Sequence, residues 1–359
     1  MKLADVRPRS KDVAIIDCQW TWSVKGIPIE KVQLGKTDIQ VSRLGLGCGT
    51  FGREIDEASS RSIMAAALDL GMTLLDTAEA YGGGQAQEYR RNILGVDDVR
   101  EVSSEMHSSE KIIGRWLKAS GNRSRITLQT KVSTNFTKLH IQEAIDASLH
   151  RLQTEWVDLY LFHSFDTKTP LEEGLEAMTR AVEQGKVRAF GCSNFSASQL
   201  NRSLEISKHC GCQRLEETQP PYSLVARQIE ADLLPLCEKE QIGVVTYSPL
   251  AAGFLSGKYQ PDRTAIPKGS RFDVIPGHAD IYFEEQNFNI VERLRLKSQQ
   301  TGVSMVGLAM GWVLQKSCIT SVLVGATGVH HLENAVAALE MPFPKEWKDE
   351  MDGWPRLES

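Results

Sequence analysis

Eight short runs of apolar and β-branched residues recur along this chain of 359 residues, and longer stretches with helical spacing separate them. This alternation is typical of βα units whose strands form one parallel sheet. In one of the longer stretches, Ile141, Ile145, Leu149 and Leu152 recur at the spacing of a helix face. Eight runs favour a closed barrel over an open doubly wound sheet, so we predict an α/β fold, a (β/α)8 TIM barrel. The expected strands are 44–47, 73–76, 126–131, 159–163, 189–192, 215–219, 244–247 and 321–324.

Three segments depart from a minimal barrel. A charged and aromatic extension precedes an expected short hairpin at 32–41, an insertion occupies 82–108, and a long loop at 252–283 follows the seventh strand. Long loops in compact domains are usually functional or disordered. The last two follow strand ends on the face where such barrels collect their functional groups, so either segment is a candidate for shaping a substrate pocket. The predicted divisions are 1–30 for the extension, 31–340 for the barrel and 341–359 for a C-terminal tail.

Composition narrows the partners and the compartment. A net charge of -5 and a pI near 6.0 give no electrostatic reason to expect nucleic acid or an anionic membrane as a partner. No apolar run approaches the ~20 residues that cross a bilayer, and the apolar stretch 13–16 is too short for a signal core. The cytoplasm is therefore expected. The seven cysteines are scattered, which suits reduced thiols. The close pair Cys210 and Cys212 supplies two ligands where a structural zinc site needs four, so no metal is expected.

Four residues with complementary chemistry stand at or just after the ends of predicted strands: Asp76, Tyr81, Lys131 and His163. A phenol is a poor acid at neutral pH, with an ordinary pKa of ~10. A nearby ammonium lowers that pKa, and a carboxylate can hold the ammonium in place. An imidazole beside the phenol can orient a carbonyl oxygen or relay a proton. The group is therefore interpreted as a proton donor for a carbonyl that is being reduced by a hydride.

The spacing and context of these four residues resemble the aldo-keto reductase superfamily, which uses an Asp, Tyr, Lys, His tetrad at these strand ends. The resemblance runs from about residue 31 to about residue 338. It implies that Tyr81 is the general acid, that Lys131 and Asp76 tune it, and that His163 orients the substrate. Further segments match the family in the expected order: 45–52, 191–195, 219–224 and 247–250.

The same resemblance implies a nicotinamide cofactor and the residues that hold it. Ser193, Asn194 and Gln219 match the groups that hydrogen-bond the carboxamide, and Tyr247 matches the aromatic residue that stacks on the nicotinamide ring. Ser248, Leu250 and Lys258 resemble the stretch that contacts the pyrophosphate, although Lys258 is equally consistent with a solvated loop lysine.

The segment with Gly325, Thr327 and His331 matches the family's anion site, where free N–H groups at a helix N-terminus favour phosphate. His331 stands where the family has Gln, and the loop lacks the Arg or Lys that often pairs with a 2′-phosphate. NADP(H) is the cofactor that the family implies, and NAD(H) stays open as an alternative.

The predicted function is therefore an NAD(P)H-dependent oxidoreductase that acts on a small-molecule aldehyde, ketone or corresponding alcohol. Two alternatives remain. One is a regulatory, β-subunit-like barrel that binds cofactor while serving a partner protein, and the other is a redox-neutral isomerase or lyase on the same scaffold. The sequence leaves the substrate, the physiological direction and the oligomeric state open.

Overall fold

The computed structural model describes residues 29–83 and 102–355. Nearly all of the predicted extension and most of the predicted insertion lie outside these residues, so the expected effect of the insertion on substrate choice stays a prediction. Within the described ranges, eight parallel strands form a closed barrel in which β10 pairs with both β3 and β9. The predicted (β/α)8 fold is confirmed, with every strand end within two residues of its expected position. The barrel strands are β3 (Leu44–Gly47), β4 (Leu74–Asp76), β5 (Thr127–Val132), β6 (Val157–Phe162), β7 (Val187–Ser193), β8 (Glu217–Gln219), β9 (Gly243–Thr246) and β10 (Ser321–Gly325).

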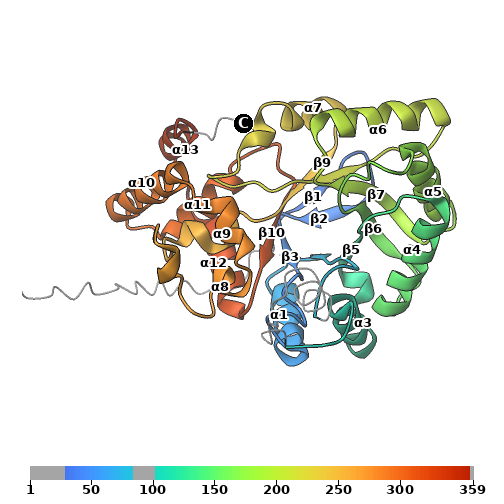
Figure 1. Cartoon of the computed structure of the whole chain (residues 1–359), viewed down its shortest axis with the longest axis horizontal. Coiled ribbons are helices and arrows are strands. Elements are labelled where there is room, and N and C mark those ends of the chain that lie inside the picture. The colour runs from blue at the N-terminus through green and yellow to red at the C-terminus, as the bar shows by residue number, and fades with distance from the viewer. Residues whose placement is uncertain (1–28, 84–101, 356–359) are drawn as a thin grey trace, which may run out of the picture.

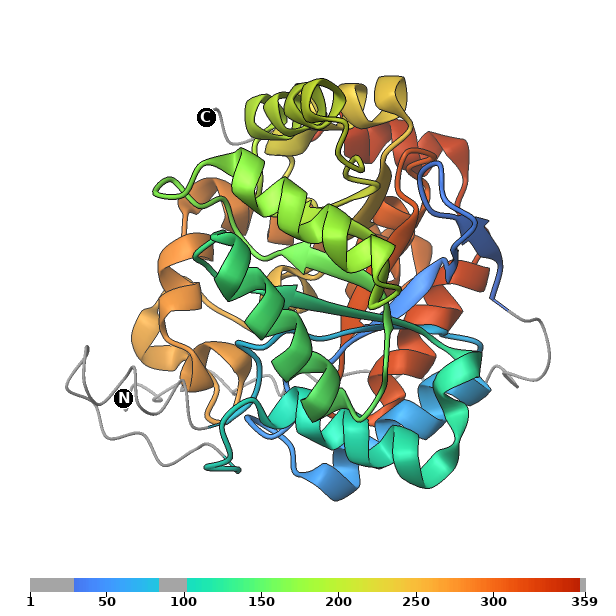
Figure 2. The same cartoon turned by 90° about the vertical axis from the view of Figure 1, so that its right-hand side faces the viewer.

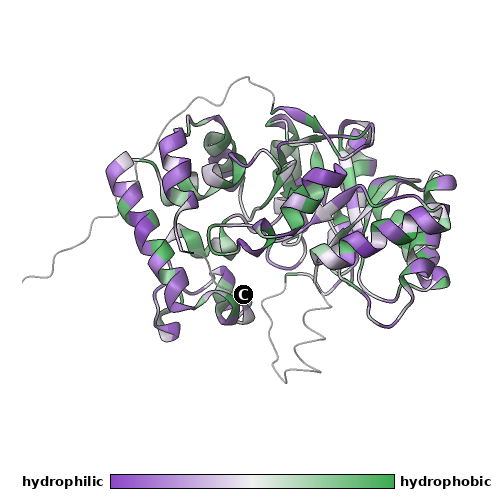
Figure 3. Ribbon diagram, turned by 90° about the horizontal axis from the view of Figure 1, so that it is seen from above, coloured by the Kyte–Doolittle hydropathy of each residue, from purple (hydrophilic) through white to green (hydrophobic). Residues whose placement is uncertain are grey.

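Amphipathic helices surround the barrel (Figure 1), and their apolar residues are buried in one core cluster with those of the strands. In α4, the predicted stripe of Ile141, Ile145, Leu149 and Leu152 is buried. Figure 3 shows hydrophobic residues concentrated on the strands, with hydrophilic residues on the outer sides of the helices. The longer helices are α1 (Glu57–Asp69), α3 (Ser108–Ser120), α4 (Lys138–Leu152), α5 (Leu171–Glu183), α6 (Ala197–Cys210), α7 (Leu233–Glu240), α10 (Glu285–Thr301), α11 (Met305–Leu314), α12 (Val329–Glu340) and α13 (Lys345–Asp352).

A short antiparallel hairpin closes the N-terminal end of the barrel, as predicted. Strands β1 (Lys31–Gln33) and β2 (Gln40–Ser42) pair with each other, and Leu34 and Ile39 between them pack into the barrel interior. Figure 2 shows this hairpin at one end of the barrel and the short helices α8 (Arg271–Val274) and α9 (Gly277–Tyr282) of the 252–283 loop at the other. The hairpin therefore plugs one end, and the C-terminal ends of the strands remain available for a site.

Two features near the C-terminal half bear on earlier expectations. Residues of the predicted tail pack on the barrel, because Met351 and Trp354 are buried and Arg227 donates to the backbone oxygen of Asp352. The expectation of reduced thiols is wrong for Cys210 and Cys212, which the structure joins in a disulfide beside the end of α6. Among the described residues, no helix combines the length and apolar character that crossing a bilayer would require.

Candidate active site

The centre of the site is a buried ion pair between neighbouring strands. Asp76 ends β4, and Lys131 lies in β5 beside it. The Lys131 ammonium lies 2.6 Å from Asp76 Oδ1 and also donates to the Thr77 carbonyl at 2.8 Å. Lys131 is fully buried. Burial acts to lower the pKa of Lys131, but Asp76 and Tyr81 outweigh it and the pKa ends above its ordinary value. Lys131 therefore keeps its positive charge at neutral pH.

Tyr81 reaches the same ammonium from the loop after β4. Its hydroxyl lies 3.4 Å from Lys131 Nζ, and the ammonium is 4.7 Å from the centre of the Tyr81 ring. Burial raises the pKa of Tyr81, and Lys131 offsets only part of that effect. The sequence analysis expected the Lys131 ammonium to lower the pKa of Tyr81 below its ordinary value. In the protein without a bound ligand this expectation is wrong, because the pKa is raised. The phenol stays protonated at neutral pH, which is the form that a proton donor needs.

His163 completes the group directly after β6. Its backbone N–H donates to Val132 at 2.9 Å, and its ring stands edge-on to Tyr81 with centroids 5.5 Å apart. Burial, with a further contribution from the Lys131 charge, lowers the pKa of His163 to about 3. The structure therefore brings the four predicted residues together, with a neutral imidazole beside the phenol.

A neutral His163 has a testable consequence. Because its pKa is depressed to about 3, the ring stays uncharged as pH falls from 7 to 5.5, whereas an ordinary histidine gains its charge near ~6.5. We expect the ratio of wild-type kcat to that of His163→Gln to stay constant between about pH 5.5 and 7, around that ordinary value. Parallel pH–rate profiles of the two proteins measure it. A ratio that changes along a single-proton curve near pH 6.5 would contradict the neutral assignment.

Two glutamines hold the Asp76 carboxylate in a way that the sequence analysis did not predict. Gln129 and Gln219 each donate through Nε2 to Asp76 Oδ1, at 2.9 and 3.0 Å. Gln219 was predicted only as a carboxamide partner, and Gln129 was not singled out. The sequence did contain a signal for Gln129. Residues two apart in a strand share a face, and Gln129 is two positions before Lys131. Glu217 is likewise two positions before Gln219 in β8, so these two side chains also lie on one face of their strand.

The predicted carboxamide-binding residues border the ion pair. Ser193 Oγ donates to the Gln219 backbone oxygen at 2.8 Å, and Asn194 Nδ2 donates to that of His163 at 3.0 Å. The Tyr247 hydroxyl in turn donates to Asn194 Oδ1 at 2.8 Å. These bonds link the ends of β6, β7, β8 and β9 on one side of the tetrad. Amide and hydroxyl groups of this kind suit a carboxamide, so the residues present fit a nicotinamide cofactor.

The predicted phosphate-binding residues lie on two segments. Ser248 and Leu250 precede η4 (Ala251–Ser256), and Lys258 follows it, with burial lowering the Lys258 pKa. Gly325 ends β10, and the Thr327 N–H donates to His331 Nδ1 at 3.3 Å. The pKa of His331 is lowered by burial and by the charges of His330 and Lys258. The fold therefore brings Lys258 within electrostatic range of His331, in the segment that was predicted to bind an anion and that has no lysine of its own.

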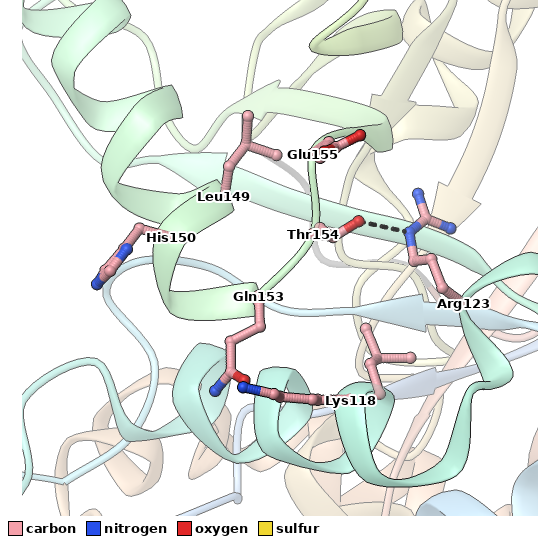
Figure 4. Close-up of a pocket in the computed structure, with 8 residues that line it drawn as sticks. Lys118, Arg123, Leu149, His150, Gln153, Thr154 and Glu155 are labelled. Atoms are coloured by element: carbon pink, nitrogen blue, oxygen red, sulfur yellow. Dashed lines mark hydrogen bonds between the residues drawn. The ribbon is translucent and has the colours of Figure 1, made fainter.

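A pocket lies away from this chemistry (Figure 4). It is lined by the last turns of α3 and α4 and the residues after them, where Arg123 donates to Thr154 Oγ1 at 3.3 Å. In a (β/α)8 barrel those helix ends lie on the face opposite the C-terminal strand ends. This pocket is therefore separate from the tetrad.

The closed barrel, with ionisable groups at the C-terminal ends of its strands, places the protein in the class of (β/α)8 barrels whose site is arranged as in enzymes. The chain belongs to the aldo/keto reductase family, whose model matches residues 43–354. It is 32% identical to the aldo-keto reductase YhdN of Bacillus subtilis, over 85% of this chain and 87% of that protein. It is 30% identical to the L-glyceraldehyde 3-phosphate reductase of Escherichia coli, over 85% and 86%. A probable voltage-gated potassium channel subunit beta of Arabidopsis thaliana is 30% identical, over 86% and 90%. The family and the reductases among these relatives support a redox enzyme.

Proposed function

We propose that the protein is an NAD(P)H-dependent oxidoreductase that interconverts an aldehyde or ketone and the corresponding alcohol. The observation that carries this proposal is the protonated Tyr81 hydroxyl beside the buried Lys131 ammonium, which is itself held by Asp76. The nicotinamide cofactor, when bound, supplies the hydride. Ser193, Asn194, Gln219 and Tyr247 would hold its nicotinamide, and Ser248, Leu250, Lys258, Gly325, Thr327 and His331 its phosphates.

Tyr81 gives its proton to the carbonyl oxygen in the direction of reduction. The resulting phenolate is stabilised by the Lys131 ammonium, which stays positive because Asp76 neutralises part of the cost of its burial. His163, neutral and edge-on to the Tyr81 ring, orients the carbonyl oxygen. In the direction of oxidation, the same phenolate removes the alcohol proton, since acid and base exchange roles between directions.

The two alternative functions are not favoured. A regulatory, β-subunit-like barrel would be expected to lack some of the proton-transfer groups. In this protein all four are present, and Lys131 contacts Asp76 and Tyr81 while Tyr81 contacts His163. No observation favours an isomerase or a lyase. A panel of carbonyls and sugars, assayed with NADPH and NADH by the absorbance of the reduced nicotinamide, tests the proposal. Failure to oxidise either cofactor with any carbonyl would contradict it.

The composition of the anion site predicts a modest cofactor preference. Because the segment from Gly325 to His331 contains no arginine or lysine, we expect NADPH to bind less than about a hundredfold more tightly than NADH, equivalent to ~2.7 kcal/mol. Because the pKa of His331 is lowered, any gain from its charge should lie below about pH 6.5. His331→Arg should increase the preference, since arginine binds phosphate through two parallel bonds.

Fluorescence titration of both cofactors at about pH 5.5 and about pH 8, on either side of the ordinary histidine pKa, measures this preference. His331→Gln is the control, because glutamine occupies this position in the family pattern and carries no charge. A preference above about a thousandfold (~4 kcal/mol) that ignores pH would contradict the prediction, and would point to a basic residue from outside this segment.

A further inference from the structure

The barrel interior beneath the tetrad holds a carboxyl group that the proposed reaction does not use. Glu217 on β8 is fully buried, and neither carboxyl oxygen has a hydrogen-bond partner among the described residues. Its neighbours in the sheet are Gly191 on β7 and Gly243 on β9. A Cβ built at Gly191 would lie 2.8 Å from that of Glu217, so the absence of a side chain there leaves the room that Glu217 occupies.

A second buried polar atom lacks a partner in the same region. Gln129 Nε2 donates to Asp76, while Gln129 Oε1 has no hydrogen-bond partner among the residues that the structure describes. The orientation of this amide is determined by chemistry, because the Asp76 carboxylate accepts hydrogen bonds and cannot donate one. The Gln129 side chain also lies close enough to the Glu217 carboxyl to act on its pKa. One proton on Glu217, donated to Gln129 Oε1, therefore satisfies both groups.

Electrostatics favour the same neutral form. An ionised Glu217 would be a carboxylate without donors in a dry interior, which is costly. The ionisable groups around it are Asp76 on β4, Lys131 on β5 and the Cys192 thiol on β7. Burial, followed by repulsion from Asp76, raises the pKa of Glu217 to about 8, with Lys131 and then Gln129 acting in the opposite direction. A carboxylic acid kept neutral by its surroundings can serve as a hydrogen-bond donor.

We propose that Glu217 is a positioning residue: as a neutral acid it holds Gln129, and through it Asp76, Lys131 and Tyr81, in the arrangement needed for proton transfer. Ionisation of Glu217 would remove the donor from Gln129 Oε1. The Gln129 amide would then turn to donate to the Glu217 carboxylate, and Asp76 would lose one of its three donors. The new negative charge would also compete for the Lys131 ammonium. This inference rests on the proposed role of Tyr81 as the proton donor.

Two substitutions separate the proton from the volume of the side chain. Glu217→Gln keeps a donor for Gln129 at every pH, whereas Glu217→Met keeps the length and removes the donor. At about pH 6.5, well below the raised pKa of Glu217, we expect Glu217→Gln to retain nearly the wild-type kcat. We expect Glu217→Met to lose about tenfold or more, because a displacement of ~1 Å in a reacting group can cost ~10²-fold. As pH rises through about 8, wild-type kcat should fall while that of Glu217→Gln does not.

Melting temperature as a function of pH provides a second measurement that needs no substrate. The pKa of Glu217 is raised from 4.5 to about 8 in the folded protein. Between these values the folded state therefore binds more protons than the unfolded state, and stability falls as pH rises through this window. Wild type should show this fall more steeply than Glu217→Gln, which does not titrate at this position.

The two measurements distinguish the failure of each idea. Equal pH dependence of melting in wild type and Glu217→Gln would overturn the neutral-acid inference whatever the activity. If the Glu217→Met variant had the same kcat as wild type, the positioning role of Glu217 would be overturned. A steeper melting response in wild type, with no turnover of any carbonyl, would support the neutral acid while rejecting the proposed reaction.

Discussion

Tyr81→Phe should lower kcat by about 10²- to 10⁴-fold, the usual contribution of general acid–base catalysis. The substitution removes only the hydroxyl that lies 3.4 Å from Lys131 and keeps the ring that packs edge-on to His163. Cofactor affinity should therefore stay within a few-fold of wild type. Steady-state assays with the best substrate of the panel, together with fluorescence titration of NADPH, measure the two quantities.

The pairing of these two measurements makes the result specific. A mutant that loses cofactor affinity in proportion to kcat would indicate a disturbed site rather than a missing proton donor. A mutant that keeps more than about a tenth of wild-type kcat would show that Tyr81 is not the acid, since even the low end of the expected contribution is ~10²-fold.

Lys131→Met should remove activity and also lower the free energy of unfolding. It leaves Asp76 buried without its cation, and breaking a buried pair on one side costs about 3–5 kcal/mol. Gln129 and Gln219 still donate to Asp76, so we expect a value near the lower end of that range. Denaturant unfolding measures the stability, and the carbonyl assay measures the activity.

Arg151→Met is the matched control. Arg151 pairs with the buried carboxylate of Glu110 outside the barrel, and Glu110 likewise keeps a second donor, Thr130. This variant should lose comparable stability and retain kcat, because Arg151 lies on α4 and hydrogen-bonds Glu110 and Ser148, not a residue of the tetrad. If Lys131→Met had the same stability and the same kcat as wild type, both the contribution of the ion pair and the catalytic role of Lys131 would be refuted. If both variants lost the same fraction of kcat, the loss of activity in Lys131→Met would be explained by its lower stability alone.

The sequence by itself determined the architecture and the tetrad. Strand and helix periodicities are local, so eight alternating runs are enough to predict the barrel. The residues at strand ends then share one face, because parallel strands in a barrel all end on the same side. Asp76, Lys131 and His163 could therefore be placed together without any knowledge of distances, and the spacing of Tyr81 from Asp76 brought it into the same group.

Only the tertiary structure decided how these groups interact. The pKa of Tyr81 depends on the balance between burial and the Lys131 charge, and burial is set by packing from the whole barrel. The proximity of Lys258 to His331, and of Gln129 to Glu217, joins residues that are 73 and 88 positions apart in the chain. Periodicity places each of these side chains on a face, but the closure of the barrel determines which faces meet across it, and that closure depends on contacts that no local pattern records.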